Sequence, residues 1–436
     1  MNLTTKPMPI LTPSIPLPSA AGGRQPWLAK FYQGAVLNSL EPLGRGSLRL
    51  ELPGGGVRQF GDSNAPTQAL IRIRNGNFFR RCVLFGDIGF GESFVENEWE
   101  TPDITAVISW FIENHERAPT LSGTKAKNSI LNLCRAVNRR IHACRSNTED
   151  MSLRNIRDHY DLGNDFYRLF LDRTMTYSSA YFDSGAGTLE AAQLAKYDRL
   201  CRLLRLQPND RVLEIGGGWG GFACHAAKHY GCHVTTVTIS EAQHSYASRL
   251  FKAKGLEAKT EVRLCDYRRI TGSYDKIVSI EMLEAVGDEF LETFFQTCQS
   301  LLKQDGLMAL QMITCPDHRY AALLRGVDWI QKHIFPGSLL LSIGRVNEAI
   351  HTTSGMVMTD LKDLGNSYAR TLKCWREAFN ARQNDILSLG FDPRFLRKWN
   401  YYFSYCEAAF AQRHISAVQV LYSRPNNPVL GDRINP

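Results

Sequence analysis

A carboxylate beside a run of glycines is the first feature of this 436-residue sequence that could carry chemistry. Glu214 precedes the spacing Gly216-x-Gly218-x-x-Gly221, which matches the pattern of a dinucleotide-binding loop. The pyrophosphate of a dinucleotide would lie at the start of the following helix, where Glu214 would repel it. The end of the next strand, residues 237–240, also lacks the acid that binds the ribose of NAD. S-adenosylmethionine has no phosphate and carries cationic groups, so the loop favours a methyl donor over a dinucleotide or a plain strand-to-helix turn.

The segments around this loop alternate between strand and helix from about residue 195 onward. Strand patterns fall at 211–216, 233–239, 260–266, 274–280 and 307–313, and helical patterns at 194–204, 221–230, 245–255 and 290–302. This alternation predicts an α/β fold, a doubly wound Rossmann-like methyltransferase domain. Such sheets bind their ligands at the carboxyl ends of the strands, where the glycine loop would lie.

The preceding part of the chain has a different pattern. Residues 46–61 alternate apolar and polar side chains around a glycine turn, which predicts a hairpin. Residues 69–79 repeat the alternation and 103–115 have helical spacing, so we expect a small α+β domain over 28–120. Six prolines in the first 27 residues predict a flexible tail there and exclude a signal peptide.

Residues 121–157 predict a basic amphipathic linker helix. Its apolar positions recur at spacings of three and four, at Ile130, Leu133, Cys134, Val137 and Ile141. Its basic residues are Lys125, Lys127, Arg135, Arg139, Arg140, Arg145, Arg154 and Arg157. Such a helix can bind anionic lipid headgroups, at about 1 kcal/mol for each basic residue near the surface, and the alternative is a solvated linker.

The net charge of +8 suits an anionic partner, either a membrane surface or nucleic acid. No nucleic-acid-binding module is recognisable, so we expect no nucleic acid partner. The sequence contains no run of about 18 apolar residues, so we expect contact with lipid from the membrane surface. Eleven cysteines without a CxxC pair indicate reduced thiols in a cytoplasmic chain and no metal site.

Long motifs along the chain closely resemble those of the cyclopropane-fatty-acyl-phospholipid synthases, which use S-adenosylmethionine and act on unsaturated membrane acyl chains. They are DHYDLGNDFYRLFLDRTMTYSSAYF at 158–182, EIGGGWGGFA at 214–223 with VTIS at 237–240, SIEMLEAVG at 279–287 and DWIQKHIFPG at 328–337. Residues 73–100 resemble the amino-terminal lipid-binding domain of the long bacterial members, and 367–379 with 401–424 resemble their carboxyl end.

The resemblance covers about residues 30 to 424 and implies a domain layout. We expect a tail at 1–27, a lipid-binding domain at 28–120, the basic linker helix at 121–157, the methyltransferase domain at 158–424 and a tail at 425–436.

Carried over by position, the resemblance implies a set of contacts to S-adenosylmethionine. They are Tyr177, Ser178, Glu214, Gly216, Gly217, Gly218, Trp219, Gly220, Thr238, Ile239, Ser240, Gln243, Asp266 and Tyr267. Methyl transfer to an isolated double bond leaves a carbocation, which aromatic faces stabilise by about 0.5–2 kcal/mol each. The candidate rings are Tyr177, Tyr181, Phe182, Trp329, Phe335 and Tyr368.

The family uses bound bicarbonate as the base that removes a proton from the new methyl group. Glu284 and Tyr368 match two of its ligands, and Ile313 matches a position that contributes through its backbone. Ser179 replaces the usual cysteine and Gln311 the usual histidine. Two outcomes follow: a rearranged anion site that still yields a cyclopropane, or a moved base that yields a methyl-branched or methylene-bearing chain.

We therefore expect an enzyme that methylates the cis double bond of an unsaturated phospholipid, with a cyclopropane as the favoured product. It would act in the cytoplasm, peripherally on the inner membrane surface, and a homodimer is plausible by resemblance. Two other hypotheses are an inactive lipid-binding relative and a methyltransferase for a small polar acceptor. The intact loop and Glu284 count against the first, and the aromatic stretches near 177–182 count against the second.

Overall fold

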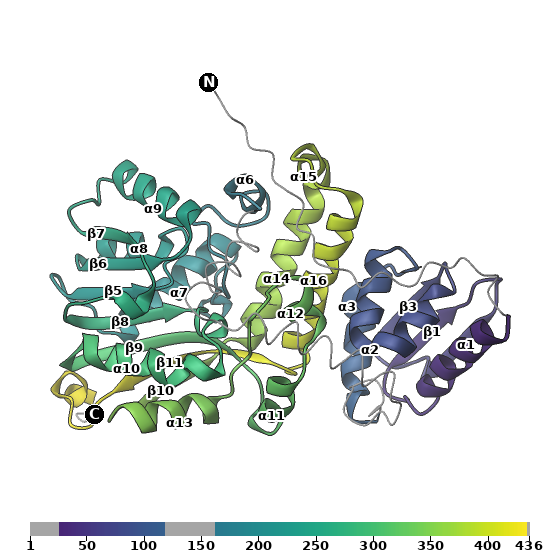
Figure 1. Ribbon diagram of the computed structural model, residues 1–436. Coiled ribbons are helices and arrows are strands. Elements are labelled where there is room, and N and C mark those ends of the chain that lie inside the picture. The colour runs from purple at the N-terminus through teal and green to yellow at the C-terminus, as the bar shows by residue number, and fades with distance from the viewer. Residues whose placement is uncertain (1–25, 118–161, 434–436) are drawn as a thin grey trace. The chain divides into compact units, whose positions relative to one another are not determined.

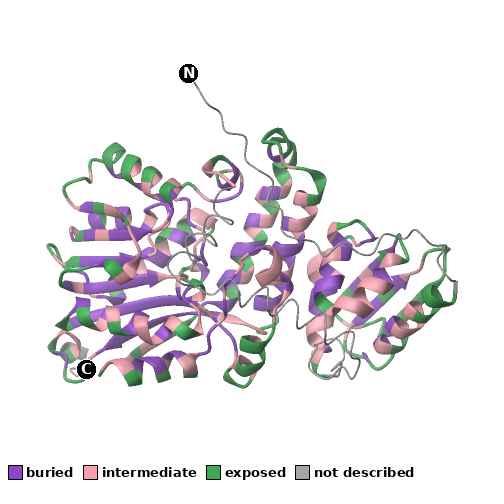
Figure 2. Ribbon diagram, viewed as in Figure 1, coloured by how far each residue is buried: buried purple, intermediate pink, exposed green. Residues whose placement is uncertain are grey.

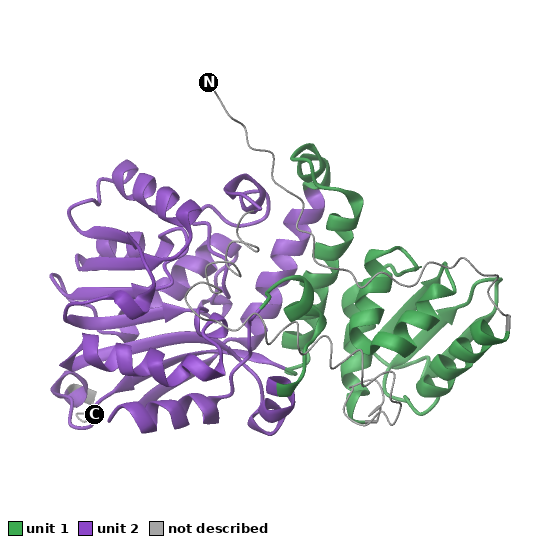
Figure 3. Cartoon of the chain, in the orientation of Figure 1, with its two compact units in different colours: residues 1–144, 325–336, 382–414 green, residues 145–324, 337–381, 415–436 purple. Residues whose placement is uncertain are grey.

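The computed structural model describes residues 26–117 and 162–433 (Figure 1). The expected basic helix at 121–157 therefore lies outside the described residues. So does the expected tail at 1–27, except for residues 26 and 27, which begin the first helix. The chain divides into two compact units (Figure 3). Unit 1 comprises residues 1–144, 325–336 and 382–414, and unit 2 comprises 145–324, 337–381 and 415–436.

Unit 1 contains a four-stranded sheet with the order β2-β1-β3-β4. The predicted hairpin is formed by β1 (Ser47–Glu51) and β2 (Val57–Gly61), which pair antiparallel. Next, β3 (Gln68–Ile73) lies parallel to β1, and β4 (Trp99–Glu100) closes the other side of β3. Along β1 and β3 the buried side chains alternate with exposed ones, as a sheet with one covered face requires.

Helices from three parts of the sequence complete unit 1. They are α1 (Pro26–Leu40), α2 (Asn77–Val95), α3 (Ile104–Glu113), α12 (Trp329–His333), α15 (Gln383–Ser388) and α16 (Pro393–Ala411). Gly91 of α2 packs so closely on α12 and α16 that a Cβ atom there would lie 2.5 Å from the Trp329 ring and 2.8 Å from that of Tyr401. Arg397 of α16 donates a 2.6 Å hydrogen bond to the backbone oxygen of Phe94.

The domain layout expected from the sequence placed these later helices in the methyltransferase domain at 158–424. By their contacts they belong to unit 1, because the aromatic face of α16 and the Trp329 ring are buried against α2 and α3. The amino-terminal unit is therefore discontinuous in sequence.

Unit 2 contains a seven-stranded sheet with the order β10-β11-β9-β8-β5-β6-β7. Its strands are β5 (Arg211–Ile215), β6 (His233–Thr238), β7 (Thr260–Leu264), β8 (Tyr274–Ile280), β9 (Leu302–Thr314), β10 (Val357–Asp363) and β11 (Ser416–Ser423). The strands β5 to β9 run parallel, whereas β11 is antiparallel to both β9 and β10. The predicted doubly wound α/β fold is confirmed.

The helices of unit 2 join and flank these strands (Figure 1). They are α6 (Asn164–Tyr167), α7 (Leu189–Leu203), α8 (Gly221–Tyr230), α9 (Glu241–Ala253), α10 (Leu291–Leu301), α11 (Asp317–Arg325), α13 (Ile343–Thr353) and α14 (Gly365–Ala381). Short 3₁₀ turns lie at His115–Arg117, Phe182–Ser184, Tyr267–Arg269, Leu283–Ala285, Asp288–Phe290 and Pro428–Arg433.

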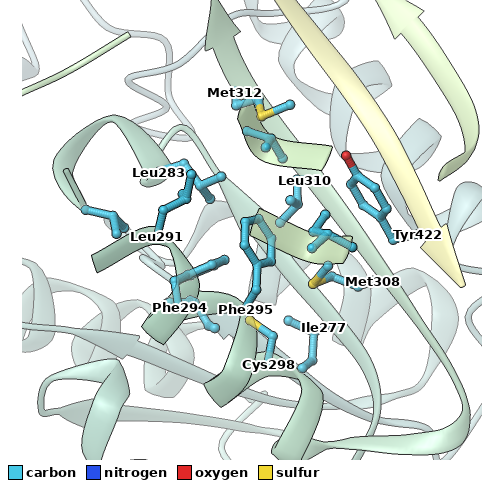
Figure 4. Close-up of a cluster of buried hydrophobic side chains, with 14 of the residues drawn as sticks. Ile277, Leu283, Leu291, Phe294, Phe295, Cys298, Met308, Leu310, Met312 and Tyr422 are labelled. Atoms are coloured by element: carbon cyan, nitrogen blue, oxygen red, sulfur yellow. The ribbon is translucent and has the colours of Figure 1, made fainter. Parts of the chain in front are cut away.

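Apolar clusters cover both faces of the seven-stranded sheet, so its central strands are largely buried, whereas the edge strands β7 and β10 are partly exposed (Figure 2). One cluster joins Leu213, Ile277 and Leu310 to Phe294 and Phe295 of α10 (Figure 4). The other joins the neighbouring strand positions Val212, Val278 and Ala309 to side chains of α7 and α8. Successive residues of β5, β8, β9 and β11 therefore enter opposite clusters, which explains the continuous apolar runs in the sequence.

The strand order reverses between β5 and β8, the two central parallel strands. In open sheets of this kind the ligand site lies beyond the carboxyl ends of the strands at such a reversal. Within the described ranges, no helix is both long enough and apolar enough to cross a membrane.

Candidate active site

The residues expected to bind the cofactor lie in unit 2, mainly at the carboxyl ends of its parallel strands. Glu214 lies near the end of β5, and the glycines up to Gly220 follow that strand. Thr238 to Gln243 join β6 to α9, and Asp266 and Tyr267 follow β7. Tyr177 and Ser178 lie in the segment before α7. The fold thus places the ends of three adjacent strands at one edge, with the 177–182 segment held there by α7 and α14.

The glycine loop presses its backbone against the neighbouring strand. A Cβ atom on Gly217 would lie 1.7 Å from the hydroxyl oxygen of Thr236 in β6, so no larger residue fits there. Gly216 and Gly220 have φ angles of 85° and 86°, which L-residues with side chains rarely adopt. The loop requires glycine for close approach as well as for its turn.

Glu214 is a buried carboxyl group at the floor of this loop, with 2% of its surface exposed. Its Oε2 atom has no hydrogen-bond partner among the described residues. Burial raises the pKa of Glu214 to about 8, and the neighbouring Thr236 hydroxyl and the charge of Lys196 oppose that rise. A cationic ligand would satisfy this carboxylate, so the loop fits the sulfonium and ammonium groups of S-adenosylmethionine.

The polar side chains at the ends of β6 and β7 form hydrogen bonds within the protein. Thr238 donates a 2.8 Å hydrogen bond to the Gln243 side chain, and Ser240 caps α9 by accepting from the Gln243 backbone. Asp266 forms two side-chain hydrogen bonds with Arg268, at 2.8 and 2.7 Å. Burial alone would raise the pKa of Asp266, but the hydrogen bonds and charge of Arg268 hold it below its ordinary value.

Side chains of α7 and α14 hold the 177–182 segment in place. Lys196 donates a 2.8 Å hydrogen bond to the Ser178 hydroxyl, and Gln193 donates one of 2.9 Å to the Ser178 backbone oxygen. From α14, the Thr371 hydroxyl accepts from the backbone N–H of Ala180. The segment that would contact both cofactor and acyl chain is therefore anchored from two sides.

Three of the residues that the resemblance implied for bicarbonate, Ser179, Gln311 and Tyr368, bond a side chain of the protein itself, Glu281. Its Oε1 atom accepts 2.8 Å hydrogen bonds from the Ser179 backbone N–H and from the Gln311 amide nitrogen. Its Oε2 atom accepts a 2.7 Å hydrogen bond from the Tyr368 hydroxyl. The Ser179 hydroxyl instead donates to the backbone oxygen of Ala180. The donor at this position is thus a backbone amide, which explains why serine can stand where the family has cysteine.

Glu281 holds this position through an unusual backbone conformation. It follows β8 directly and has a φ angle of 51°, in the left-handed region. A residue with a side chain adopts that region at a cost of about 1–2 kcal/mol. The backbone N–H of Glu281 donates a 2.7 Å hydrogen bond to the Gln311 backbone oxygen, which helps to fix the conformation.

Glu284 lies one turn further along and has a different environment. Its Oε1 atom accepts from the Ile313 backbone N–H, whereas its Oε2 atom has no partner among the described residues. Burial, together with the charge of Glu281, raises the pKa of Glu284 to about 8. The resemblance assigned the Ile313 backbone to bicarbonate, whereas in this structure its N–H donates to Glu284.

Lys196 supplies a buried positive charge between these carboxyl groups. Its side chain is wholly inaccessible to solvent, and burial lowers its pKa to about 7 against the attraction of Glu281, Asp172 and Glu214. A lysine removed from water is stable only beside such partners. Lys196 therefore links the cofactor loop to the Glu281 site by charge.

The aromatic side chains proposed as a cation-stabilising wall separate into groups. Tyr177 and Tyr368 both pack on Trp375 of α14, with ring centroids 5.1 and 6.2 Å apart. The faces of Tyr181 and Phe182 are instead covered by cationic side chains of the protein. Trp329 and Phe335 belong to unit 1, where they pack on Tyr401 and Tyr402.

Three functional candidates were missed in the sequence: Glu281, Lys196 and Trp375. Glu281 lies in a quoted motif, but its role depends on a backbone conformation that spacing does not reveal. Lys196 had a usable signal, because Lys196 and Leu200 share one face of the helix predicted over 194–204, where a lysine is out of place beside a buried apolar side chain.

Comparisons with known proteins agree with the fold and identify the family. The family model described as mycolic acid cyclopropane synthetase matches residues 147–420. A tuberculostearic acid methyltransferase of Mycobacterium tuberculosis is 36% identical over 399 residues, which cover 87% of this chain and 88% of that protein. The cyclopropane-fatty-acyl-phospholipid synthase of Escherichia coli is 33% identical over 365 residues, which cover 83% and 89%.

A solved structure of a mycolic acid cyclopropane synthase, complexed with SAH and CTAB, matches with a TM-score of 0.58 at 32% identity. The match covers 62% of this chain and 98% of that one. The family resemblance inferred from the sequence motifs is confirmed by these findings.

Proposed function

Because this chain belongs to the mycolic acid cyclopropane synthetase family, we propose that it methylates a cis double bond in the acyl chain of an unsaturated phospholipid and closes a cyclopropane ring there. The protein is an S-adenosylmethionine-dependent methyltransferase that acts on lipid. The observation that carries the proposal is the pair of carboxyl groups after β8, Glu281 and Glu284, beside the strand that bears the glycine loop.

S-adenosylmethionine, when bound, supplies a methyl group to one carbon of the double bond, and the other carbon is left with a positive charge. Glu214 balances the positive charge of the cofactor, because it is buried and its Oε2 atom has no protein partner among the described residues. Gly217 lets the loop backbone approach the ligand without a side chain in the way.

The chain's own residues then have two tasks: to shield the cation and to remove a proton from the new methyl group. The Tyr177, Tyr368 and Trp375 rings form an aromatic group beside the 177–182 segment, and π faces attract a cation. Glu281 and Glu284 provide the oxygen atoms that can receive a proton. Methylation of a small polar acceptor would need none of these apolar surroundings.

A methylene-bearing acyl chain is the second candidate product. It is favoured by the 36% identity, over 87% of this chain, to a tuberculostearic acid methyltransferase. If a hydride first shifts from the methylated carbon to the charged carbon, the positive charge moves to the methylated carbon. Loss of a proton from the methyl group then gives an exocyclic double bond in place of a ring. A methyl branch would then require a separate hydride-donating enzyme.

The enzyme would meet its substrate at a membrane surface, and α1 of unit 1 is the element suited to that contact. Trp27 and Phe31 lie one helical turn apart and expose 61% and 59% of their surfaces, with Leu28 beside them. Large apolar side chains exposed on one helix are typical of segments that lie in the lipid interface. The basic residues of 121–157 would add attraction to anionic headgroups.

Vesicle sedimentation tests this contact. Replacing both Trp27 and Phe31 with alanine should weaken binding to anionic phospholipid vesicles by about tenfold or more, because buried aromatic area is lost from the interface. The matched control replaces Leu324 and Leu361, two exposed apolar residues of unit 2, and should bind as the wild type does. Equal weakening in both variants would contradict a specific role for α1.

The reaction itself is tested by lipid mass spectrometry in a bacterial host that makes unsaturated phospholipids but no cyclopropanes. Chains heavier by one CH2 that resist alkene-specific derivatisation would support the cyclopropane. Chains of the same mass that still react as alkenes would support the methylene product. No new lipid from a protein that binds S-adenosylhomocysteine would favour the inactive lipid-binding relative.

A further inference from the structure

Glu281 occupies the place that a bound anion would need. A carboxylate and a bicarbonate ion present the same planar pair of oxygen atoms to hydrogen-bond donors. Here the donors from Ser179, Gln311 and Tyr368 all point to the Glu281 carboxylate, at 2.8, 2.8 and 2.7 Å. These donors cannot also hold bicarbonate, so the site as folded does not fit that ion.

A hydrogen-bond chain fixes the direction in which Gln311 donates. Arg199, which can only donate, bonds the side-chain oxygen of Gln419 at 2.7 Å. The Gln419 amide nitrogen donates to the Gln311 oxygen at 2.8 Å, which leaves the Gln311 nitrogen facing Glu281. The arginine thus orients both amides, and Gln311 presents Glu281 with a permanent donor that suits an ionised carboxylate.

The two oxygen atoms of Glu281 are not equally engaged. A carboxylate offers about four acceptor sites, two on each oxygen. Among the described residues, Oε1 accepts two hydrogen bonds and Oε2 accepts one, from the Tyr368 hydroxyl. Oε2 therefore retains an acceptor position for a proton.

Glu284 is the less suitable proton acceptor of the pair. Burial and the negative charge of Glu281 raise its pKa to about 8, so it is protonated at neutral pH. Burial also raises the pKa of Glu281, but its three hydrogen bonds and the charge of Lys196 oppose that rise, whereas at Glu284 the charge of Glu281 adds to it. Two carboxyl groups in different environments can thus hold different protonation states.

We propose that the Glu281 carboxylate is the catalytic base and takes the place of bicarbonate, so that the enzyme works without that ion. The inference rests on the proposed function. Once the methyl group is attached, one of its C–H bonds breaks, and the electron pair forms the C–C bond that closes the ring. The proton passes to Oε2 of Glu281, which becomes a neutral carboxylic acid, and it returns to water after the product leaves.

The test uses the full-length enzyme, S-adenosylmethionine and vesicles of dioleoylphosphatidylglycerol, in buffer freed of carbon dioxide. Wild-type turnover should be the same with and without added bicarbonate. Glu281→Gln should lower turnover by at least about 100-fold, the usual contribution of a general base, with unchanged affinity for S-adenosylhomocysteine. The matched control Glu257→Gln, at an exposed position, should behave as the wild type.

Glu281→Gly provides a second variant that favours folding, because glycine tolerates the left-handed backbone at this position. It removes the carboxylate and leaves its donors exposed to an added anion. We expect it to be inactive in carbonate-free buffer and to regain turnover saturably with added bicarbonate. Isotope-labelled bicarbonate should bind to Glu281→Gly and not to the wild type, as measured by carbon NMR.

Three results would overturn the proposal: wild-type turnover that depends on bicarbonate, retained turnover in Glu281→Gln, or labelled bicarbonate bound by the wild type at this site. The binding arm needs no lipid substrate. If the wild type makes no methylated lipid in any buffer, the proposed function fails, whereas the NMR comparison still decides whether Glu281 occupies the anion site.

Discussion

Glu214 links the charge of the cofactor to the pH of the solution. Burial raises its pKa to about 8 in the ligand-free protein, and Lys196 opposes the rise. A cationic ligand favours the ionised form, so binding releases a proton whenever the pH lies below that pKa. We expect the affinity for S-adenosylmethionine to increase as the pH is raised towards 8 and to level off above it, as measured by titration calorimetry.

Glu214→Gln is the control for this dependence. It should bind the cofactor weakly throughout and lose the slope, because its amide cannot ionise. A slope of the same size in Glu214→Gln would assign the titration to Lys196 instead.

Tyr368 acts on the reaction through Glu281. Its hydroxyl hydrogen bond stabilises the ionised carboxylate and so lowers the pKa of Glu281. Tyr368→Phe should therefore raise that pKa and move the acidic limb of the pH–turnover profile to higher pH, with activity partly recovered in alkaline buffer. Tyr320→Phe, which removes a hydroxyl bonded to Asp288, should leave the profile unchanged. An unshifted limb in Tyr368→Phe would separate Tyr368 from Glu281.

Among the residues of the site, the hydrogen-bond donors could be predicted from the sequence, but the carboxylate that accepts from them could not. The sequence predicts that Ser179, Gln311, Ile313 and Tyr368 lie together. In the structure three of them donate to Glu281, and Ile313 donates to Glu284. The occupant was missed, because which of two glutamates in one short motif turns inward depends on the φ angle of Glu281.

Among the elements, the turn between β5 and α8 is limited by its neighbour β6. Gly217→Ala would place a Cβ atom 1.7 Å from the Thr236 hydroxyl oxygen, so the loop or the strand must shift. We expect a loss of roughly 1–3 kcal/mol of stability, measured by denaturant unfolding, and weaker cofactor binding. Adding Thr236→Ala removes the clashing oxygen and should restore part of both losses. Purely additive effects in the double variant would show that the clash is not the cause.

The elements of unit 2 could be predicted more completely than those of unit 1. Strands buried on both faces have long apolar runs, and every predicted strand from 211 to 313 is present. In contrast, α2 was not predicted, because the glycines at 86, 89 and 91 obscure its helical pattern. Gly86 lies at a kink, and Gly91 lacks a side chain where the Trp329 ring packs. The glycines therefore serve packing that the local sequence does not reveal.

At the scale of the whole molecule, unit 1 combines residues from both sides of the 118–161 region. We expect that a protease site inserted between residues 121 and 157, once cut, will not release an independent amino-terminal fragment. The two pieces should co-purify under native conditions, because α16 and Trp329 complete the core of unit 1. Separation should require denaturant, as followed by size-exclusion chromatography.

Trp329→Ala is the companion variant in this experiment. It removes a ring buried against Gly91 and Tyr401, and it should allow the cut pieces to separate more readily. If the cut pieces that retain Trp329 separated without denaturant, the discontinuous unit 1 would be contradicted. The sequence motifs could not reveal this arrangement, because each motif resembles the family locally while the contacts that define a unit join distant segments.

The discontinuity of unit 1 also sets the order of events during synthesis. Its sheet and first helices leave the ribosome early, but α16 follows only after nearly the whole methyltransferase sheet has been made. Until then, the surfaces of α2 and α3 that later pack on α16 lack their partner and expose apolar area to water. We therefore expect that the amino-terminal segment of the nascent chain depends on protection from aggregation during this interval. The enzyme becomes a finished molecule only when its last strands emerge.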